Sequence, residues 1–218
     1  MIWSNNFAYA VGLMTSDGNL SKDGRHLIFV SKDLEQIKNF INILHLTSKV
    51  GLKKGGYAQV KKYYFVQFSN IKLYRFLISI GLCPKKSKIL KELLIPDKYF
   101  AHFLRGLFDG DGFTYSYWDK RWKSSFMLYS GFVSASKKFL EWIKETIKRL
   151  YKISGSINSD GKSAYQLLYA KKASLVLIKE MYKNSYDFFL KRKRFKIERA
   201  LSIIKQSAGM LELVDRHA

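Results

Sequence analysis

Apolar and polar residues follow two different periods along the first half of the chain. Where apolar residues recur at helical spacing, as in Leu34, Ile37, Ile41 and Leu44, they predict one buried face of a helix. Where β-branched and aromatic residues fill short runs between turn-forming residues, they predict strands. The predicted order is a helix over 6–16, two strands within 18–31, a helix over 32–46, a hairpin over 48–69 and a helix over 70–82.

The second half of the chain repeats this order of elements without close sequence identity. Its predicted elements are a helix over 96–110, two strands within 113–134 around Asp119 and Lys120, a helix over 137–151, a hairpin over 155–170, and helices within 174–184 and 188–206. An internal duplication is the simplest explanation of a repeated order. We therefore predict an α+β fold of two α-β-β-α-β-β-α halves, over residues 1–92 and 93–206, with 207–218 as a peripheral tail.

Composition narrows the classes of protein that this pattern fits. Hydrophobic residues occupy 47% of the 218 positions, which is enough for a packed core, but no apolar run reaches the roughly 20 residues of a membrane-spanning helix. The first residues lack the basic start and cleavage site of a signal peptide. A single cysteine argues against a disulfide framework and four scattered histidines against structural zinc. We expect an intracellular protein of the cytoplasm or nucleoid, or of an organelle matrix.

Net charge indicates the chemical class of the partner. Lysine and arginine total 39 against 17 acidic residues, which gives a net charge of +22. Phosphate polyanions are the expected partner of such a chain, because each neutralised phosphate releases counterions. An anionic membrane surface is the alternative, but the basic residues are spread over predicted strands, turns and helices rather than gathered on one amphipathic helix. We expect a nucleic acid as the partner and no association with a membrane.

Two short segments carry the candidate chemistry, "AVGLMTSDG" at 10–18 and "LRGLFDGDG" at 104–112. Gly12 and Gly106 hold equivalent places in the two predicted helices, where a glycine lets two helix backbones approach closely. If the helices pack in parallel, Asp17 and Asp111 meet at their C-terminal ends. A carboxylate is unfavourable at the negative end of a helix dipole, and two such ends together are worse. A divalent cation bound between them would remove this penalty, and oxygen ligands suit Mg²⁺.

These paired segments resemble the two signatures of single-chain LAGLIDADG homing endonucleases, and the resemblance extends over residues 5–205. It implies two curved antiparallel sheets that bind DNA, with the two motif helices packed between them. It also implies that Asp17 and Asp111 bind two or three Mg²⁺ ions, with Mn²⁺ as a substitute, and that a backbone carbonyl of Ser16 or Gly110 assists. Thr15 departs from the family pattern, and Asp109 keeps the acid at a position that is not a metal ligand.

The family also places a basic residue after the last hairpin and helix of each half. The matching segments are "CPKKSK" and "LKRKRFK", in which we assign the catalytic role to Lys86 and Lys193. Such a lysine would stabilise the negative charge that develops on the phosphate during hydrolysis. A solvated basic face is the plain alternative for each lysine. Ser31 and Ser134, at the end of the second strand of each half, are weaker candidates for positioning solvent.

The strands are predicted to lie in the major groove, which is wide enough for a β-ribbon. Two halves would cover on the order of 20 base pairs, because a strand of about ten residues spans about one turn of DNA. Alternation along the strands suggests which side chains contact DNA, although a slip of one residue inverts each assignment. The candidates are Asn19, Ser21, Lys54, Gln59, Lys61, Tyr63, Gln67, Tyr115, Tyr117, Arg121, Lys123 and Ser125.

The function implied by the resemblance is that of a monomeric, Mg²⁺-dependent, site-specific DNA endonuclease. It would hydrolyse one phosphodiester bond per strand at a long double-stranded target and so promote the mobility of an intron or intervening sequence. One alternative on the same fold is an RNA maturase that assists splicing. A second alternative is a DNA-binding regulator that has lost catalysis, although such proteins typically lose a motif acid and both acids are present here.

Overall fold

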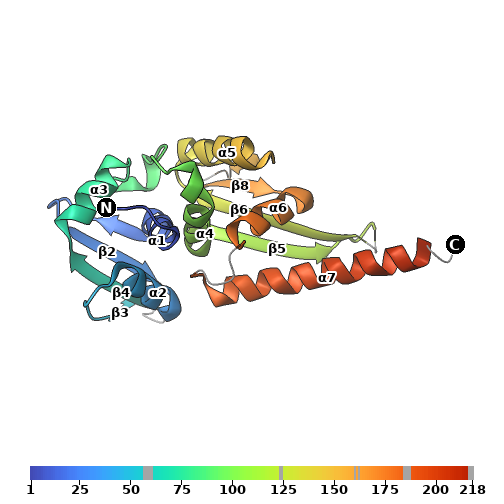
Figure 1. Cartoon of the computed structure of the whole chain (residues 1–218), viewed down its shortest axis with the longest axis horizontal. Coiled ribbons are helices and arrows are strands. Elements are labelled where there is room, and N and C mark those ends of the chain that lie inside the picture. Colours follow the sequence, from blue (N-terminus) through green and yellow to red (C-terminus); the bar gives the residue numbers. More distant parts are fainter. Residues whose placement is uncertain (56–60, 123–124, 160, 162, 184–187, 216–218) are drawn as a thin grey trace.

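The computed structural model describes residues 1–218 except 56–60, 123–124, 160, 162, 184–187 and 216–218. Figure 1 shows two sheets on either side of a central pair of helices. The first half contains α1 (Asn5–Ser16), β1 (Gly18–Leu20), β2 (His26–Ser31), α2 (Leu34–Leu44), β3 (Gly51–Gly55), β4 (Lys61–Ser69), α3 (Ile71–Ser79) and the 3₁₀ turn η1 (Lys86–Lys88).

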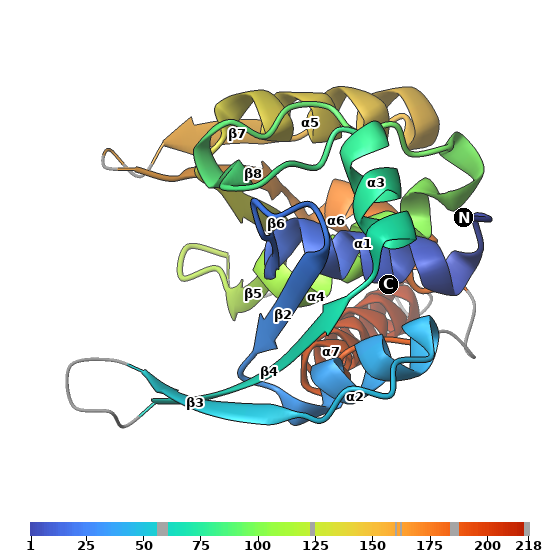
Figure 2. The same cartoon turned by 90° about the vertical axis from the view of Figure 1, so that its left-hand side faces the viewer.

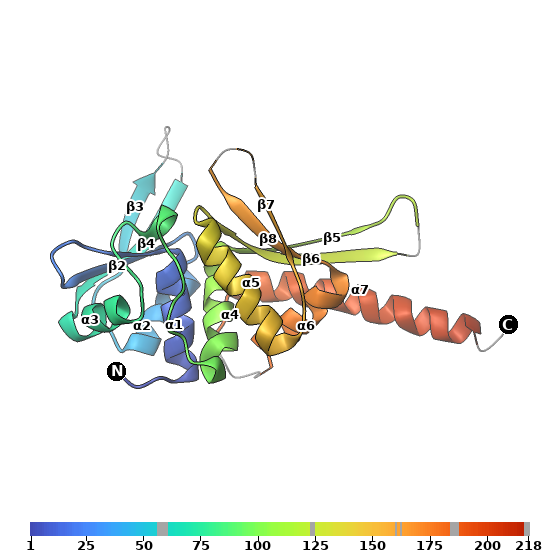
Figure 3. The same ribbon diagram turned by 90° about the horizontal axis from the view of Figure 1, so that it is seen from above.

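The second half follows the same order and then adds a long helix. It contains the 3₁₀ turn η2 (Asp97–Tyr99), α4 (Phe100–Asp111), β5 (Gly112–Trp118), β6 (Phe126–Ser134), α5 (Lys137–Tyr151), β7 (Ser156–Ser159), β8 (Tyr165–Tyr169), α6 (Lys171–Met181) and α7 (Lys191–Asp215). Helix α7 runs alongside β5 and continues to Asp215, inside the segment predicted as a tail (Figures 1 and 3).

Both sheets are four-stranded and antiparallel, with strand orders β1-β2-β4-β3 and β5-β6-β8-β7. The predicted α+β fold with repeated halves is therefore confirmed. Figures 2 and 3 show the β3–β4 and β7–β8 hairpins extending to the same side of the molecule. The C-terminal ends of α1 and α4 point to that side as well (Figure 3).

One face of each sheet is covered by helices, and alternation along the strands decides which residues are buried there. In the first sheet Leu27 and Phe29 of β2 pair with Phe68 and Val66 of β4, and these four side chains are buried. Phe40 of α2 packs on them, with its ring centroid 4.5 Å from that of Phe29. The residues between them on each strand face the other way, so each sheet keeps one open face.

In the second sheet, Leu128 and Phe132 of β6 take the equivalent buried positions. The ring of Phe132 lies 5.9 Å from that of Phe108 on α4, in an edge-to-face arrangement. Helices α5, α6 and α7 also pack against β6. This helix-covered side of the second sheet is therefore continuous with the centre of the molecule.

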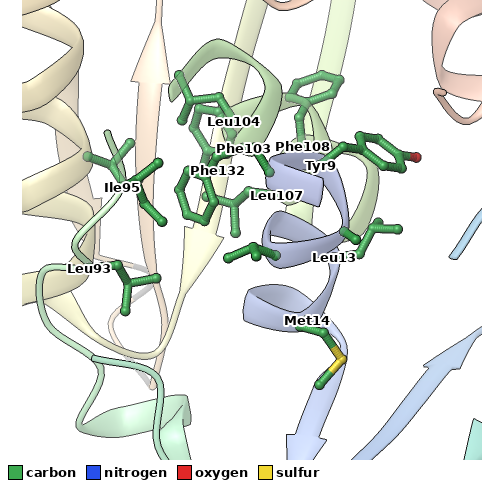
Figure 4. Close-up of a cluster of buried hydrophobic side chains, with 14 of the residues drawn as sticks. Tyr9, Leu13, Met14, Leu93, Ile95, Phe103, Leu104, Leu107, Phe108 and Phe132 are labelled. Carbon is green, nitrogen blue, oxygen red and sulfur yellow. The ribbon is translucent and has the colours of Figure 1, made fainter. Parts of the chain in front are cut away.

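Helices α1 and α4 form that centre and are buried over most of their length. Figure 4 shows the buried side chains that α1, α4 and Phe132 contribute to this centre. At the crossing, a Cβ atom on Gly12 would lie 2.7 Å from the backbone nitrogen of Leu107 and 2.9 Å from Cα of Gly106. Neither glycine has room for a side chain, because the partner backbone occupies that space.

The structure differs from the prediction at the β5–β6 turn. Alternation was predicted to align Arg121, Lys123 and Ser125 along a strand, but β5 ends at Trp118 and β6 begins at Phe126. Arg121 and Ser125 belong to the turn, where the Arg121 backbone N–H donates to Asp119 Oδ1 at 2.9 Å. The prediction was wrong here because the Asp119 carboxylate organises a turn that periodicity does not reveal. Lys123 lies outside the described residues.

None of the helices in the described part of the chain is both long enough and apolar enough to span a lipid bilayer. This finding agrees with the absence of a long apolar run in the sequence.

Replacing Gly12 with alanine should destabilise the protein, although alanine is the better helix former. The added methyl group would force α1 and α4 apart, and overpacking of this kind costs about 1–3 kcal/mol. Because the added Cβ would overlap the Phe103 carbonyl oxygen, we expect a cost near the upper end of that range. After the helix-propensity gain of about 1 kcal/mol, the net loss in urea unfolding should be about 2 kcal/mol. Asn6→Ala, at an exposed position of the same helix, is the control and should change stability by less than about 0.5 kcal/mol. Equal stability of the two variants would contradict the close backbone contact.

Candidate active site

Asp17 and Asp111 lie side by side because α1 and α4 end together. Asp17 caps α1, and its backbone N–H donates to the Leu13 carbonyl oxygen at 3.0 Å. Asp111 is the last residue of α4. Both side chains reach solvent on their outer side. The pair therefore stands at the exposed end of the helix seam, on the side from which the strand hairpins extend (Figure 3).

Gly110 is the residue that allows the two ends to come so close. A Cβ atom at this position would overlap the Ser16 hydroxyl and would lie 2.7 Å from Asp17 Oδ2. Ser16 itself turns its hydroxyl back into α1, donating to the Leu13 carbonyl oxygen at 3.0 Å. Gly110 of the second motif therefore has no room for a side chain, because Ser16 of the first motif faces it.

Burial raises the pKa values of both carboxylates. Burial of its inner side raises the pKa of Asp17 from 3.8 to about 6, and repulsion by Asp111 adds to this effect. Burial also raises the pKa of Asp111. Each shift means that the ionised form is held against a preference for the neutral one. Such a pair would gain from a bound cation.

Lys86 and Lys193 lie beside the carboxylates in equivalent contacts. Lys86 Nζ donates to the carbonyl oxygen of Gly18, the last residue of the first motif. Lys193 Nζ donates to the carbonyl oxygen of Gly112, the last residue of the second motif, at 2.7 Å. Each ammonium group thus lies at the C-terminal end of a motif helix, where the helix dipole is negative.

Both lysines are held in protein rather than in water. Burial lowers the pKa of Lys86, while attraction to Asp111 and Asp17 opposes the shift. Burial lowers the pKa of Lys193 to about 8, against attraction to Asp109 and to the motif carboxylates. With a pKa of about 8, Lys193 remains largely protonated at neutral pH.

Asp109 is buried and serves a different purpose from its neighbours. Its Oδ2 accepts hydrogen bonds from the Tyr9 hydroxyl at 2.8 Å and from the Leu190 backbone N–H at 2.7 Å. Burial raises its pKa to about 6, although these hydrogen bonds oppose the shift. Leu190 directly precedes α7, which carries Lys193. Asp109 therefore fixes the start of the helix that brings this lysine to the site.

The first motif has no such connection. Thr15, which holds the place of Asp109, donates its hydroxyl to the Val11 carbonyl oxygen of its own helix at 2.8 Å. Instead, the first half is joined to α7 through α2. Arg192 forms two hydrogen bonds with the Asp33 carboxylate, at 2.8 and 2.7 Å, and Asn39 Nδ2 donates to the Phe189 carbonyl oxygen at 3.2 Å. Sequence reasoning missed all of these contacts.

A cavity of about 270 Å³ opens beside Asp17. Its lining includes Asp17, Ser31, Gln36, Tyr63, Asp109, Gly110 and Arg192. Gln36 is buried, and among the described residues its Nε2 has no hydrogen-bond partner. This amide can donate to an oxygen atom that enters the cavity. Sequence reasoning overlooked it, since a lone glutamine in the first turns of a helix has no distinguishing pattern.

The serines proposed to position solvent make local contacts, and the role proposed for them stays a prediction. The Ser31 hydroxyl donates to Gln36 Oε1 at 2.5 Å and accepts from the Asp33 backbone N–H at 3.1 Å. Ser134 accepts from the Ser136 backbone N–H, also at 3.1 Å. The two serines thus shape the same turn in each half, and Ser31 also lines the cavity.

The predicted DNA contacts fall into three groups. The open faces of the sheets carry Asn19, Tyr63, Gln67, Tyr115 and Tyr117, because their buried neighbours on the same strands face the helices. Lys54 and Lys61 belong to β3 and β4, Ser21 follows β1, and Arg121 and Ser125 lie in the β5–β6 turn. Gln59, like Lys123, falls outside the described residues.

The arrangement fits a metal that is shared with a substrate. In the part of the chain that is described, no three His, Cys, Asp or Glu side chains gather into a complete metal site. Asp17 and Asp111 supply two carboxylates, and Mg²⁺ typically takes one or two carboxylates together with water and substrate phosphate. The backbone carbonyl of Gly110, which was predicted to assist in metal binding, accepts a hydrogen bond from Lys193 Nζ at 3.0 Å.

Comparison with solved structures identifies the fold. No family model matches the sequence, and neither does any curated protein. The LAGLIDADG homing endonuclease I-LtrWI bound to target DNA matches with a TM-score of 0.62 and 12% identity, covering 97% of this chain and 96% of that one. I-DmoI in complex with DNA and Mn matches with a TM-score of 0.50 and 18% identity, covering 81% of this chain and 95% of that one.

A different protein on this fold also matches. Full-length DUF199/WhiA from Thermatoga maritima has a TM-score of 0.59 and 14% identity, and the match covers 100% of this chain and 69% of that one. At these levels of identity the likeness concerns the fold. The chain therefore has the LAGLIDADG fold.

Replacing Asp17 with asparagine should stabilise the metal-free protein at pH 7. The folded-state pKa of about 6 lies above the unfolded value of 3.8, so the native state binds more protons in this window and gains stability as pH falls through it. Asparagine carries no charge, so it removes the free-energy cost of keeping the Asp17 carboxylate ionised in the folded protein at neutral pH. Allowing for solvent screening of an exposed group, we expect a gain of about 1 kcal/mol. The gain should shrink between pH 6 and pH 4 in urea unfolding with chelator.

Asp97→Asn is the control, for which we expect a change of stability in the opposite direction. Hydrogen bonds from Arg149 lower the pKa of Asp97, so its removal should decrease stability at pH 7. A decrease for both variants would contradict the repulsion inferred between Asp17 and Asp111.

Replacing Asp109 should distinguish hydrogen bonding from charge. Asp109→Ala leaves the Tyr9 hydroxyl and the Leu190 N–H without their acceptor, and each buried unsatisfied donor costs about 1–3 kcal/mol, so we expect a loss of about 3 kcal/mol. Asp109→Asn keeps a carbonyl acceptor and should lose about 1 kcal/mol or less. Hydrogen exchange of the Leu190 amide should accelerate in the alanine variant alone. Equal effects of the two substitutions would show that the carboxylate acts through its charge.

Proposed function

We propose that this chain is a site-specific, divalent-cation-dependent DNA endonuclease that hydrolyses one phosphodiester bond in each strand of a duplex. The observation that carries the proposal is the placement of Asp17 and Asp111 at two adjoining helix ends, each beside a lysine that contacts the last glycine of its motif. Two equivalent sets of groups within one chain suit two strands, so a monomer suffices.

DNA would bind to the open faces of the two sheets. The strand hairpins extend on the same side as the carboxylates (Figures 2 and 3), and the chain carries a net charge of +22. A duplex across both sheets would run over the helix seam, and its phosphates would neutralise this charge. The structures of I-LtrWI and I-DmoI, which share the fold, contain DNA.

Asp17 and Asp111 are the residues that would hold the cations, together with phosphate oxygens of the DNA. A bound Mg²⁺ or Mn²⁺ would activate water and stabilise the leaving oxygen. The raised pKa values of the two carboxylates support this assignment, because a cation between them would favour their ionised forms. The presence of Mn with I-DmoI and DNA agrees with it.

Lys86 and Lys193 would stabilise the charge that develops on the phosphate. Lys193, with a pKa of about 8, is largely protonated at neutral pH, and both side chains are partly withdrawn from water, where a cation acts more strongly. Gln36 would donate to an oxygen within the cavity beside Asp17. These groups bind and orient the phosphate and stabilise its transition state.

Two other activities would use the same fold, namely assistance of RNA splicing and DNA binding without cleavage. The retention of both aspartates and both lysines favours cleavage over either alternative. A role in the mobility of an intron or intervening sequence follows from the resemblance of the motifs, and it depends on the cleavage activity.

Cleavage should be assayed with a library of long duplexes, in Mg²⁺ and in chelator, with sequencing of the ends produced. Asp17→Asn and Asp111→Asn should each reduce cutting to nicks in one strand or abolish it. Lys86→Ala and Lys193→Ala should lower the rate by about 10²–10³, the usual cost of losing one stabilising group. Lys22→Ala, at an exposed lysine of the β1–β2 turn, is the matched control and should cut normally.

Metal-dependent cutting at one long site, lost in the aspartate variants, would support the proposal. Specific binding of a duplex without cutting in Mg²⁺ or Mn²⁺ would favour a regulator, and preferential binding of a structured RNA would favour splicing. Cutting that survives both aspartate substitutions would contradict the assigned site.

A further inference from the structure

An aromatic ladder occupies one face of the second sheet. Phe113, Tyr115 and Tyr117 alternate along β5, and Tyr129 of β6 pairs with Tyr115 across the strands. Consecutive rings on β5 are nearly parallel, with centroids 6.2 and 6.3 Å apart, and the Tyr115 and Tyr129 rings stack at 4.9 Å. We use the term tyrosine ladder for these four residues.

The tyrosine ladder lies on the open face of the sheet. Gly112 and Thr114, which alternate with the ladder along β5, are buried on the helix side. On β6, Leu128 is buried on that side as well. Tyr115 is 40% and Tyr117 46% exposed, which is unusual for rings that could pack in a core. The ladder therefore faces the same space as the strand hairpins and the Asp17–Asp111 pair.

The first sheet presents different chemistry in the corresponding place. Its β1-β2-β4 row consists of Asn19, Ile28 and Gln67, with both amide side chains exposed. Asparagine and glutamine are suited to pair with the N6 and N7 edge of adenine. The two open faces thus do not offer the same contacts to the two halves of a target.

Stacking limits what the tyrosine ladder can present to a partner. Neighbouring rings stack on one another, so ring edges and hydroxyl groups are the parts of the inner rings that a partner can reach. In the major groove of a duplex the thymine methyl group is the apolar feature among the base edges, and apolar side chains contact it.

We propose that the tyrosine ladder selects thymine by contact with its methyl groups, in the half of the target that faces the second sheet. The inference rests on the proposed binding of duplex DNA and adds a base preference to one half only. It predicts that the two halves of the target are read by different means, through methyl groups on one side and amide hydrogen bonds on the other.

Replacing thymidine by deoxyuridine tests the proposal, because uracil lacks only the methyl group. The probe is the duplex recovered in the cleavage assay, with uracil placed in one half-site or the other, and binding is measured in Ca²⁺. We expect uracil to weaken binding by about two- to fourfold per contacted methyl group, in one half-site only. Tyr115→Ala should remove this difference, whereas Tyr115→Phe, which keeps the ring, should retain it.

Gln67→Ala, on the first sheet, is the matched control and should leave the uracil effect unchanged. Equal binding of thymine and uracil in both half-sites would overturn the proposal while the endonuclease function stands. So would a uracil effect that persists in Tyr115→Ala. Loss of single-strand binding in Tyr115→Ala, with duplex binding unchanged, would show that the ladder serves unpaired bases. Failure to recover any duplex would contradict the proposed function itself.

Discussion

The close contact of α1 and α4 at Gly12 and Gly106 is the constraint on which the rest of the structure depends. Because neither residue has a side chain, the two backbones touch and the helices end at the same place. This contact brings two carboxylates and two negative helix ends together, an arrangement that electrostatics disfavours. The sheets, the lysines and the buried polar network are all arranged around this point.

The protein offsets part of the resulting repulsion with its own groups. Lys86 and Lys193 reach the ends of the two motif helices, each from its own half of the chain, and donate to backbone carbonyl oxygens at or just beyond those ends. The compensation is incomplete, since the pKa of Asp17 remains raised to about 6. This incomplete compensation supports the proposed binding of a cation between the two carboxylates.

Much of the fold could be predicted from the sequence, because periodicity reports burial on one face. The two motif segments and the repeated order of helices and strands follow from that signal, and glycine spacing indicated where the central helices meet. The β5–β6 turn was expected around Asp119 and Lys120, but its extension to Ser125 was missed, because it depends on the Asp119 carboxylate accepting hydrogen bonds from the backbone and side chain of Arg121. The partners of Asp109 were missed because Tyr9 and Leu190 lie far from it in the sequence.

The contacts of α7 have a consequence for how such chains can be recombined. Asp109 of the second half is held by Tyr9 of the first, and Arg192 of α7 is paired with Asp33 of α2. The two halves are consequently not interchangeable modules, although they repeat the same order of elements. A hybrid protein that joined this first half to the second half of a different protein would need compatible residues at both of these contacts. Inheritance of the two halves together is therefore favoured.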